Sequence, residues 1–203
     1  TRSERGAYLY LDQMGLLGLS FSRFEIEQKL ATVRKKSRSV DQPESASVPQ
    51  IRSLLYNRII AVTGGAMGFG EGIARLLFGD GQSTPNRAPF IRTDVTDADS
   101  VGTAVYETVL EFSGLDVMIS NAGVLQAGGI GEMDPKTFDF VTRVNYHGYY
   151  NCIRASAPVM QQQNKYAPGN FGDIIQINSK SGLEGSKKNF AYAGSKFAGI
   201  GLT

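Results

Sequence analysis

The stretch IIAVTGGAMGFGEGIA, Ile59 to Ala74, decides how the rest of this chain folds. Its first four residues are apolar and mostly β-branched, which is typical of a strand buried on both faces. Glycines then recur at Gly64, Gly68 and Gly70, and a helical segment follows them. A strand, a glycine-rich turn and a helix in this order predict an α/β unit with a parallel strand.

The glycine loop of this unit predicts a nucleotide site. Glycines allow a sharp turn and let the backbone come close to a pyrophosphate. The helix that starts there offers free N–H groups and a partial positive charge to an anion. A glycine pattern alone is equally consistent with a simple turn, but the strand before it and the helix after it favour nucleotide binding.

The same alternation of strands and helices continues along the chain. Asp134 followed by Pro135 is typical of a helix start, and apolar residues follow at helical spacing. We therefore predict an α/β, Rossmann-type, doubly wound parallel sheet. Its expected strands are Ile59–Val62, Ala88–Val95, Leu115–Ser120 and Asp173–Asn178.

The chain divides into three expected parts. Residues 1–40 form a helical N-terminal extension, residues 41–56 a polar linker, and residues 57–203 the Rossmann domain. The extension contains a capping box at Ser22 and Glu25, followed by an apolar stripe at helical spacing. About 40 residues bury little core alone, so we expect the extension to pack on the main domain or on another subunit.

Composition narrows the function classes. The net charge of +2 is too small to indicate a nucleic-acid or anionic membrane partner. One cysteine, Cys152, and one histidine, His147, provide neither a disulfide framework nor a zinc cluster. The sequence has no apolar run of about 18 residues and no signal-peptide pattern. We expect a soluble, cytoplasmic protein without a metal centre.

Motifs in residues 57–203 resemble those of the short-chain dehydrogenase/reductase family. The glycine loop is similar to the family's T-G-x-x-x-G-x-G motif, and SNAG is similar to its N-N-A-G motif, with serine in place of the first asparagine. A helix asparagine, a serine and a Y-x-x-x-K signature follow in the family's order. The matching residues are Thr63, Gly64, Gly68, Gly70, Asp94, Ser120, Asn121, Ala122, Gly123, Asn145, Ser179, Tyr192 and Lys196.

This resemblance implies a nicotinamide dinucleotide cofactor. We expect NAD, because no lysine or arginine lies between Gly64 and Gly70 to bind the extra phosphate of NADP. NADP stays open, because the second strand that carries the family's selector residue is missing from the interval before Asp94. The expected cofactor contacts are Gly64, Gly68, Phe69, Gly70, Asp94, Val95, Asn121, Ala122, Gly123, Tyr192 and Lys196.

The chemistry follows from the spacing of two residues. Tyr192 and Lys196 stand four apart, which places both on one face of a helix. A tyrosine is a poor base near neutral pH, and a nearby cation stabilises its phenolate. We assign Tyr192 as the acid/base and Lys196 as its cationic partner. The resemblance implies that Ser179 binds the substrate oxygen and that Asn145 holds a proton-relaying water.

The stretch from Ile174 to Thr203 suggests a substrate. It resembles sorbitol-6-phosphate 2-dehydrogenases and related sugar-phosphate dehydrogenases, so the expected reaction oxidises a secondary alcohol such as a sugar alcohol phosphate. Lys180, Ser181 and Lys187 then become candidates for binding the substrate phosphate, together with Ser179 at the reacting carbon. The alternative is that these lysines only face water.

Two other functions stay open: an NADPH-dependent oxoacyl reductase of the same family, and a non-catalytic nucleotide-sensing module on this fold. The family resemblance implies a homodimer or homotetramer, in which the helices of Asn145 and Tyr192 pair across subunits. The chain ends inside the Tyr192 helix, before the family's later strands. We therefore expect an incomplete sheet and a C-terminal part that is missing from this sequence.

Overall fold

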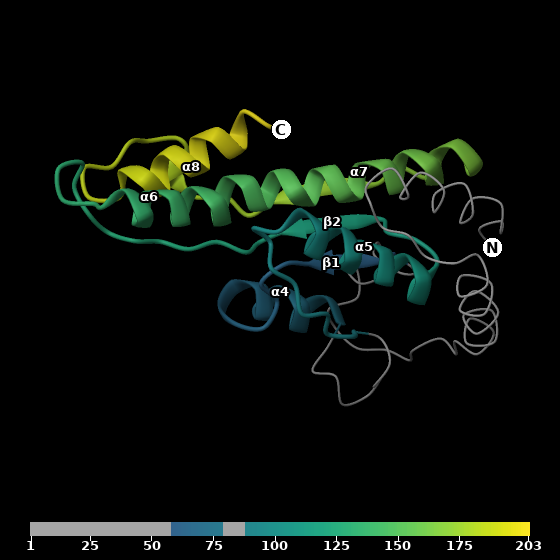
Figure 1. Cartoon of the computed structure of the whole chain (residues 1–203). Coiled ribbons are helices and arrows are strands. Elements are labelled where there is room, and N and C mark those ends of the chain that lie inside the picture. The colour runs from purple at the N-terminus through teal and green to yellow at the C-terminus, as the bar shows by residue number, and fades with distance from the viewer. Residues whose placement is uncertain (1–57, 79–87) are drawn as a thin grey trace.

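The computed structural model describes residues 58–78 and 88–203 of the chain (Figure 1). The predicted helical extension and linker lie outside the described residues. The predicted Rossmann domain is described from Arg58 onward, apart from residues 79–87. None of the helices in these two ranges is long and apolar enough to cross a membrane.

The described sheet has three parallel strands: β1 (Ile60–Val62), β2 (Val117–Ser120) and β3 (Asp173–Gln176). Their order is β1-β2-β3, so β2 lies in the centre. Parallel strands connected through helices confirm the predicted α/β, Rossmann-type fold. Three of the four expected strands are present, each shorter than its apolar run, because a strand ends where its ladder of hydrogen bonds ends.

Helices and helical turns connect these strands. Figure 1 shows β1 and β2 running between α7 above and α4 below, and α5 packs against α7. A five-residue π turn, η2, joins α6 to α7 without a break in the helix. The elements are α4 (Gly68–Phe78), α5 (Ala98–Phe112), α6 (Pro135–Thr142), η2 (Arg143–His147), α7 (Gly148–Tyr166), η3 (Lys180–Gly182) and α8 (Phe190–Ile200).

Local chemistry explains where two of the helices begin. The Asp134 carboxylate accepts hydrogen bonds from the Lys136 N–H at 2.9 Å and the Thr137 N–H at 3.0 Å, which caps α6 as predicted. The Asp97 carboxylate caps α5 in the same way through the Asp99 N–H at 3.0 Å. Each cap pairs N–H groups that the helix itself leaves without a partner.

The core lies between α5, α7 and the central strand. Full burial of an aliphatic side chain stabilises the fold by about 1.5–3 kcal/mol, so this cluster holds the two helices on β2. Its members include Val101, Val105, Tyr106, Val109, Leu110, Leu115, Met118, Cys152, Ala155 and Val159.

The prediction of a strand at Ala88–Val95 is wrong. Its described backbone is irregular, and Phe90 is 78% exposed. β-Branched and apolar residues favour a strand only where a neighbouring strand completes the ladder. The polar groups at the end of this segment instead bond locally: the Asp94 N–H donates to Ser100 Oγ at 2.9 Å.

The first strand departs from the burial on both faces that its apolar run predicted, and the third strand is also partly exposed. β2 is buried along its whole length, but β1 is only half-buried, and along β3 exposed and half-buried residues alternate. Ile175 in β3 is 44% exposed. Within the described residues the sheet is therefore open at both edges, as expected for an incomplete Rossmann sheet.

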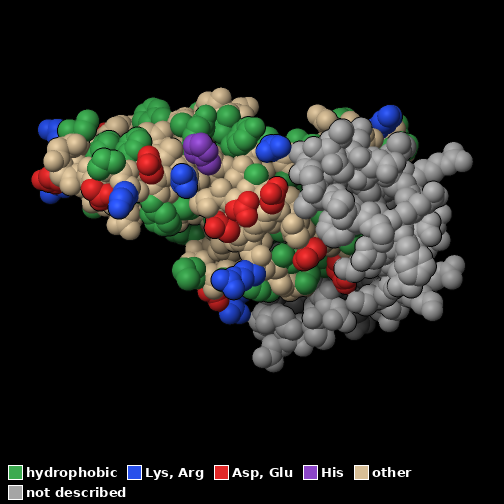
Figure 2. Space-filling model, in the orientation of Figure 1, with side chains coloured by type: hydrophobic (Ala, Val, Ile, Leu, Met, Phe, Trp, Pro, Cys, Tyr) green, Lys and Arg blue, Asp and Glu red, His purple; other side chains and the backbone are tan. Residues whose placement is uncertain are grey.

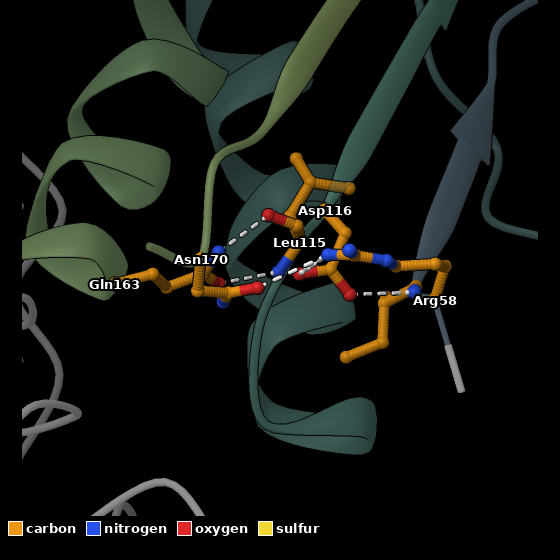
Figure 3. A network of polar contacts seen from close by, with 6 residues as sticks. Arg58, Leu115, Asp116, Gln163 and Asn170 are labelled. Carbon is orange, nitrogen blue, oxygen red and sulfur yellow. Dashed lines mark hydrogen bonds and ion pairs between the residues drawn. The ribbon is translucent and has the colours of Figure 1, made fainter. Parts of the chain in front are cut away.

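Polar side chains tie together the amino end of the sheet (Figure 3). The Gln163 side chain binds both backbone groups of Leu115, each at 2.7 Å. Asp116, 2% exposed, accepts from the Ile59 N–H at 2.8 Å, and Arg58 donates to the Asn170 side chain at 3.0 Å. These contacts are structural, and they lie at the end of the sheet opposite to the loops described next.

Candidate active site

The carboxyl ends of the three parallel strands meet at one edge of the sheet. Thr63 directly follows β1, Asn121 follows β2, and the segment leading to Ser179 follows β3. Ligands of open parallel sheets bind at this edge, where loops diverge above the strands. The predicted cofactor and catalytic motifs therefore come from neighbouring loops of one edge.

The glycine loop adopts conformations that explain its glycines. Gly64 has φ of +65° and Gly68 has φ of +58°, which side-chain-bearing residues rarely adopt. A Cβ at Gly70 would overlap the carbonyl oxygen of Gly64 and the side-chain nitrogen Nδ2 of Asn121. Phe69 is 85% exposed at the start of α4. The loop is thus folded tightly against β2 while the N-terminus of α4 stays open to solvent.

Thr63 and Asn121 join the loops after β1 and β2. The Thr63 hydroxyl oxygen accepts from the N–H groups of Asn121 and Ala122, each at 3.1 Å. The Asn121 side chain donates to the Thr63 carbonyl at 3.0 Å. Sequence reasoning placed Thr63 in the motif without a role, and the structure shows that it holds the SNAG turn against the glycine loop.

A pocket of about 540 Å³ lies beside this loop. It brings together four of the predicted cofactor residues, Gly64, Asp94, Val95 and Ala122. Sequence reasoning missed the other lining residues, of which two are arginines. The full lining is Gly64, Arg92, Thr93, Asp94, Val95, Thr96, Ala122, Phe140, Arg143 and Val144.

Hydrogen bonds from Thr96 hold the Asp94 carboxylate in one orientation in this pocket. Its Oδ1 accepts from the Thr96 N–H at 2.9 Å and from the Thr96 hydroxyl at 2.8 Å. These two bonds hold the pKa of the Asp94 carboxyl below its usual value. The carboxylate is therefore ionised at neutral pH.

Asn145 lies in the π turn between α6 and α7 and is only 2% exposed. Its Nδ2 donates to the Val124 carbonyl at 2.9 Å, and its Oδ1 accepts from the Val124 N–H at 2.8 Å. The second Nδ2 proton is directed to Ser195 Oγ at 3.0 Å. Single π turns inside helices are frequent at functional sites, where they turn one residue out of register.

Lys196 is a buried cation on α8. It is 5% exposed, and its Nζ donates to the Ile177 carbonyl at 2.7 Å. The same Nζ lies 5.6 Å from the centre of the Tyr192 ring. Burial lowers the pKa of the Lys196 ammonium, because water stabilises the charged form better than this site does.

Gly123 lies beside both of these residues. A Cβ there would approach Asn145 Oδ1 to 3.3 Å and Lys196 Nζ to 3.7 Å. The SNAG turn, the π turn and α8 therefore meet within a few ångströms, next to the pocket-lining residue Ala122.

Ser179 begins the short helix η3 after β3. Its Oγ accepts from the Ser181 N–H at 3.2 Å, and its own N–H donates to Asn178 Oδ1 at 2.7 Å. Asn178 Nδ2 in turn donates to the Lys196 carbonyl at 3.2 Å. Asn178, which sequence reasoning did not assign, thus ties the Ser179 turn to the helix of Tyr192 and Lys196.

The predicted phosphate-binding lysines lie on the loop between Ser179 and Tyr192. Lys180 and Lys187 are exposed, and Ser181 is half-buried. The neighbouring Lys188 carbonyl accepts from the Gly128 N–H at 2.7 Å, which joins this loop to the segment after the SNAG turn. The phosphate-binding role itself stays a prediction.

Cys152 packs in the core on α7, the helix that follows Asn145. It is fully buried, and burial raises the pKa of its thiol to about 11, although a hydrogen bond with Ser120 opposes this effect. Its thiol therefore stays protonated at neutral pH. Ser120 occupies the place of the first asparagine of the family motif and is buried beside it.

Comparison with known proteins agrees with this geometry. Residues 81–203 match the model of the short chain dehydrogenase family. The secoisolariciresinol dehydrogenase of Forsythia intermedia is 32% identical over 73% of this chain and 59% of that protein. The sorbitol-6-phosphate 2-dehydrogenase of Escherichia coli is 40% identical over 45% of this chain and 34% of that protein.

A 3-oxoacyl-(acyl-carrier-protein) reductase of Staphylococcus aureus is 34% identical over 56% of this chain and 44% of that protein. The chain spans about three fifths of the length of relatives such as the Forsythia enzyme. The family model covers more than half of the chain, including the π turn and α8. This protein therefore belongs to the short-chain dehydrogenase family.

Proposed function

We propose that this chain carries the cofactor site and catalytic centre of an NAD(P)-dependent oxidoreductase. The reaction is hydride transfer between a nicotinamide and a secondary alcohol or ketone. The observation that supports it best is the meeting of Asn145, Lys196 and Gly123 beside the pocket that Gly64 and Asp94 line. A dinucleotide lying across Gly123 would reach both regions.

The residues present fit a nicotinamide dinucleotide. The left-handed glycines and the open N-terminus of α4 suit a pyrophosphate, and Asp94 offers a carboxylate to the adenine amino group. The buried Lys196 supplies N–H donors for ribose hydroxyls. When bound, the nicotinamide ring accepts or returns the hydride.

The chain's own residues would handle the proton. Tyr192 exchanges it with the substrate oxygen, and the Lys196 cation, 5.6 Å from the ring centre, stabilises the phenolate. Ser179 donates a hydrogen bond to the same substrate oxygen and stabilises its developing charge. Asn145, held at Val124, positions the water that relays protons to solvent.

The test of this centre is Tyr192→Phe. It should reduce turnover at least about 100-fold, which is the usual scale for a lost acid/base, while the affinity for the dinucleotide stays unchanged. Tyr146→Phe serves as the control, since Tyr146 packs on His147 with ring centroids 5.7 Å apart. Near-normal turnover of Tyr192→Phe would reject Tyr192 as the acid/base. A wild-type protein that binds the dinucleotide without any turnover would instead favour the nucleotide-sensing module.

A sugar alcohol phosphate is the substrate class that we propose. Support comes from the exposed cations Lys180 and Lys187 on the loop of Ser179 and from the similarity to the Escherichia coli enzyme. A charge-assisted phosphate bond contributes about 1.5–3 kcal/mol, which corresponds to about 10- to 100-fold in affinity.

Lys180→Ala should therefore raise the KM for a phosphorylated polyol by about 10- to 100-fold and barely change it for the unphosphorylated polyol. Lys188→Ala is the matched control, because this lysine is also exposed and only its backbone carbonyl bonds to Gly128. Equal losses on both substrates would show that Lys180 serves the loop's structure.

A second candidate is a reductase of oxoacyl thioesters that uses NADPH. The observation that favours it is the pair Arg92 and Arg143 in the pocket beside Asp94, since guanidinium groups bind phosphate well. We nevertheless propose NAD, because the loop from Gly64 to Gly70 contains no cation. Comparing kcat/KM for NAD and NADP decides this, and an NADP advantage that disappears in Arg92→Ala would support the reductase.

We further propose that the protein is a homodimer or homotetramer. Large apolar side chains are exposed on α6, α7 and α8: Phe138 by 42%, Phe140 by 48%, Tyr150 by 47% and Phe197 by 46%. Figure 2 shows apolar side chains at the end of the molecule where α6 and α8 lie, interspersed with charged ones. A monomer in light scattering of the full-length protein at micromolar concentration would contradict this proposal.

A further inference from the structure

We propose that Ser195 is a positioning residue that orients Asn145 toward the helix of Tyr192 and Lys196. This proposal rests on the proposed function. Ser195 is 4% exposed and directly precedes Lys196. Its Oγ donates to the Tyr192 carbonyl at 2.7 Å and accepts from Asn145 Nδ2 at 3.0 Å.

The direction of these hydrogen bonds is determined by the groups involved. A serine hydroxyl has one proton, and a backbone carbonyl only accepts, so the Ser195 proton points at the Tyr192 carbonyl. The oxygen of Ser195 is then free to accept one Nδ2 proton of Asn145. The Ser195 hydroxyl thus donates its proton to the Tyr192 carbonyl and accepts one from Asn145.

Asn145 is held in one orientation by this arrangement. Its Oδ1 accepts from the Val124 N–H, and its two Nδ2 protons go to the Val124 carbonyl and to Ser195. An exchange of the Oδ1 and Nδ2 positions would bring N–H toward N–H and oxygen toward oxygen. Without the Ser195 oxygen, one buried N–H of Asn145 loses its acceptor.

The bond matters because it connects two separate segments. Asn145 lies in the π turn of a long helical run, and Ser195 lies 50 residues later on α8. α8 packs on both η2 and α6. The Ser195 hydroxyl therefore sets the position of the Tyr192 backbone relative to Asn145, and a small shift there moves the phenol away from the substrate oxygen.

A purely structural role makes a different prediction. Serine hydroxyls often bond to a carbonyl three or four residues earlier in a helix, and such a bond alone has no catalytic consequence. Ser156 in α7 offers a matched comparison. It is fully buried, and its Oγ has no hydrogen-bond partner among the described residues.

The experiment compares Ser195→Ala, Ser195→Thr and the control Ser156→Ala in the full-length protein. We expect Ser195→Ala to lower kcat by about 10- to 100-fold, the scale for a slightly misplaced catalytic group. The KM for the dinucleotide should stay constant, and the pH profile of kcat should shift. Ser195→Thr should restore kcat and its wild-type pH profile, because a threonine hydroxyl can form the same bond within a helix.

A second readout does not depend on activity. Hydrogen exchange at the Val124 amide, measured by mass spectrometry of peptides, should become about fivefold faster in Ser195→Ala, the scale of one lost hydrogen bond. Ser156→Ala should leave it unchanged. If Ser195→Ala does not fold, Ser195→Cys, which has a similar volume and donates only weakly, replaces it in all measurements.

The outcomes separate this proposal from the proposed function. A wild-type protein without turnover would reject the proposed function, and the exchange rate at Val124 would still decide the role of Ser195. Unchanged exchange in Ser195→Ala overturns the positioning role. An active wild type whose Ser195→Ala variant keeps its kcat and pH profile overturns it as well, even if thermal stability falls.

Discussion

Replacing Gly70 by alanine should separate the role of the glycine loop from ordinary helix propensity. Gly70 is the third residue of α4, and a Cβ there would lie 2.8 Å from the Gly64 carbonyl carbon and overlap its oxygen. Gly72, two residues later in the same helix, has no atom within 4 Å of the corresponding position. The pair Gly70→Ala and Gly72→Ala thus differs only in the contact with the loop.

The magnitude follows from two opposing terms. Alanine stabilises a helix interior by about 0.5–1 kcal/mol relative to glycine, and both variants gain this amount. Gly70→Ala additionally forces the Gly64 carbonyl and the Asn121 amide apart, and overpacking of this kind costs about 1–3 kcal/mol. The two variants should therefore differ by about 2 kcal/mol, or about 4–8 °C in Tm for a chain of this size.

Thermal unfolding of both variants and of the wild type measures this difference. Gly72→Ala should melt at or above the wild-type temperature, and Gly70→Ala below it. A fluorescence titration with the dinucleotide should also show a Kd about tenfold higher, and only for Gly70→Ala. The reason is that the displaced Gly64 carbonyl belongs to the glycine loop that would bind the pyrophosphate. Equal Tm and equal Kd for the two variants would refute the assignment of close packing at Gly70.

Further predictions concern stability and reactivity. Gln163→Ala leaves both backbone groups of Leu115 without their partner, so urea unfolding should show a loss of about 2–3 kcal/mol. Asp134→Ala removes the cap of α6 and should cost about 0.5–2 kcal/mol in the same assay. Burial lowers the pKa of Lys196 in the folded chain, so the unfolded chain binds more protons than the folded chain in the alkaline range below 10.5. The free energy of unfolding of the wild type should therefore rise with pH in this range. Lys196→Met should lack this rise. Cys152, with a pKa of about 11, should react with thiol reagents at neutral pH only after unfolding.

Local patterns in the sequence were sufficient for the elements whose causes lie within a few residues. The apolar run before Thr63 predicted β1, the glycines after it predicted the turn into α4, and Asp134 with Pro135 predicted the start of α6. Each depends on a backbone conformation or a cap formed by sequence neighbours.

Only the tertiary structure decided features that depend on partners far away in the chain. Ala88–Val95 has a strand-like composition, yet it stays irregular, because pairing rather than composition makes a strand. The bond between Asn145 and Ser195 joins residues 50 positions apart, and Thr63 meets Asn121 across 58 positions. A side-chain hydroxyl or amide can form a hydrogen bond with many different groups. Its actual partner therefore depends on how distant helices and strands pack together.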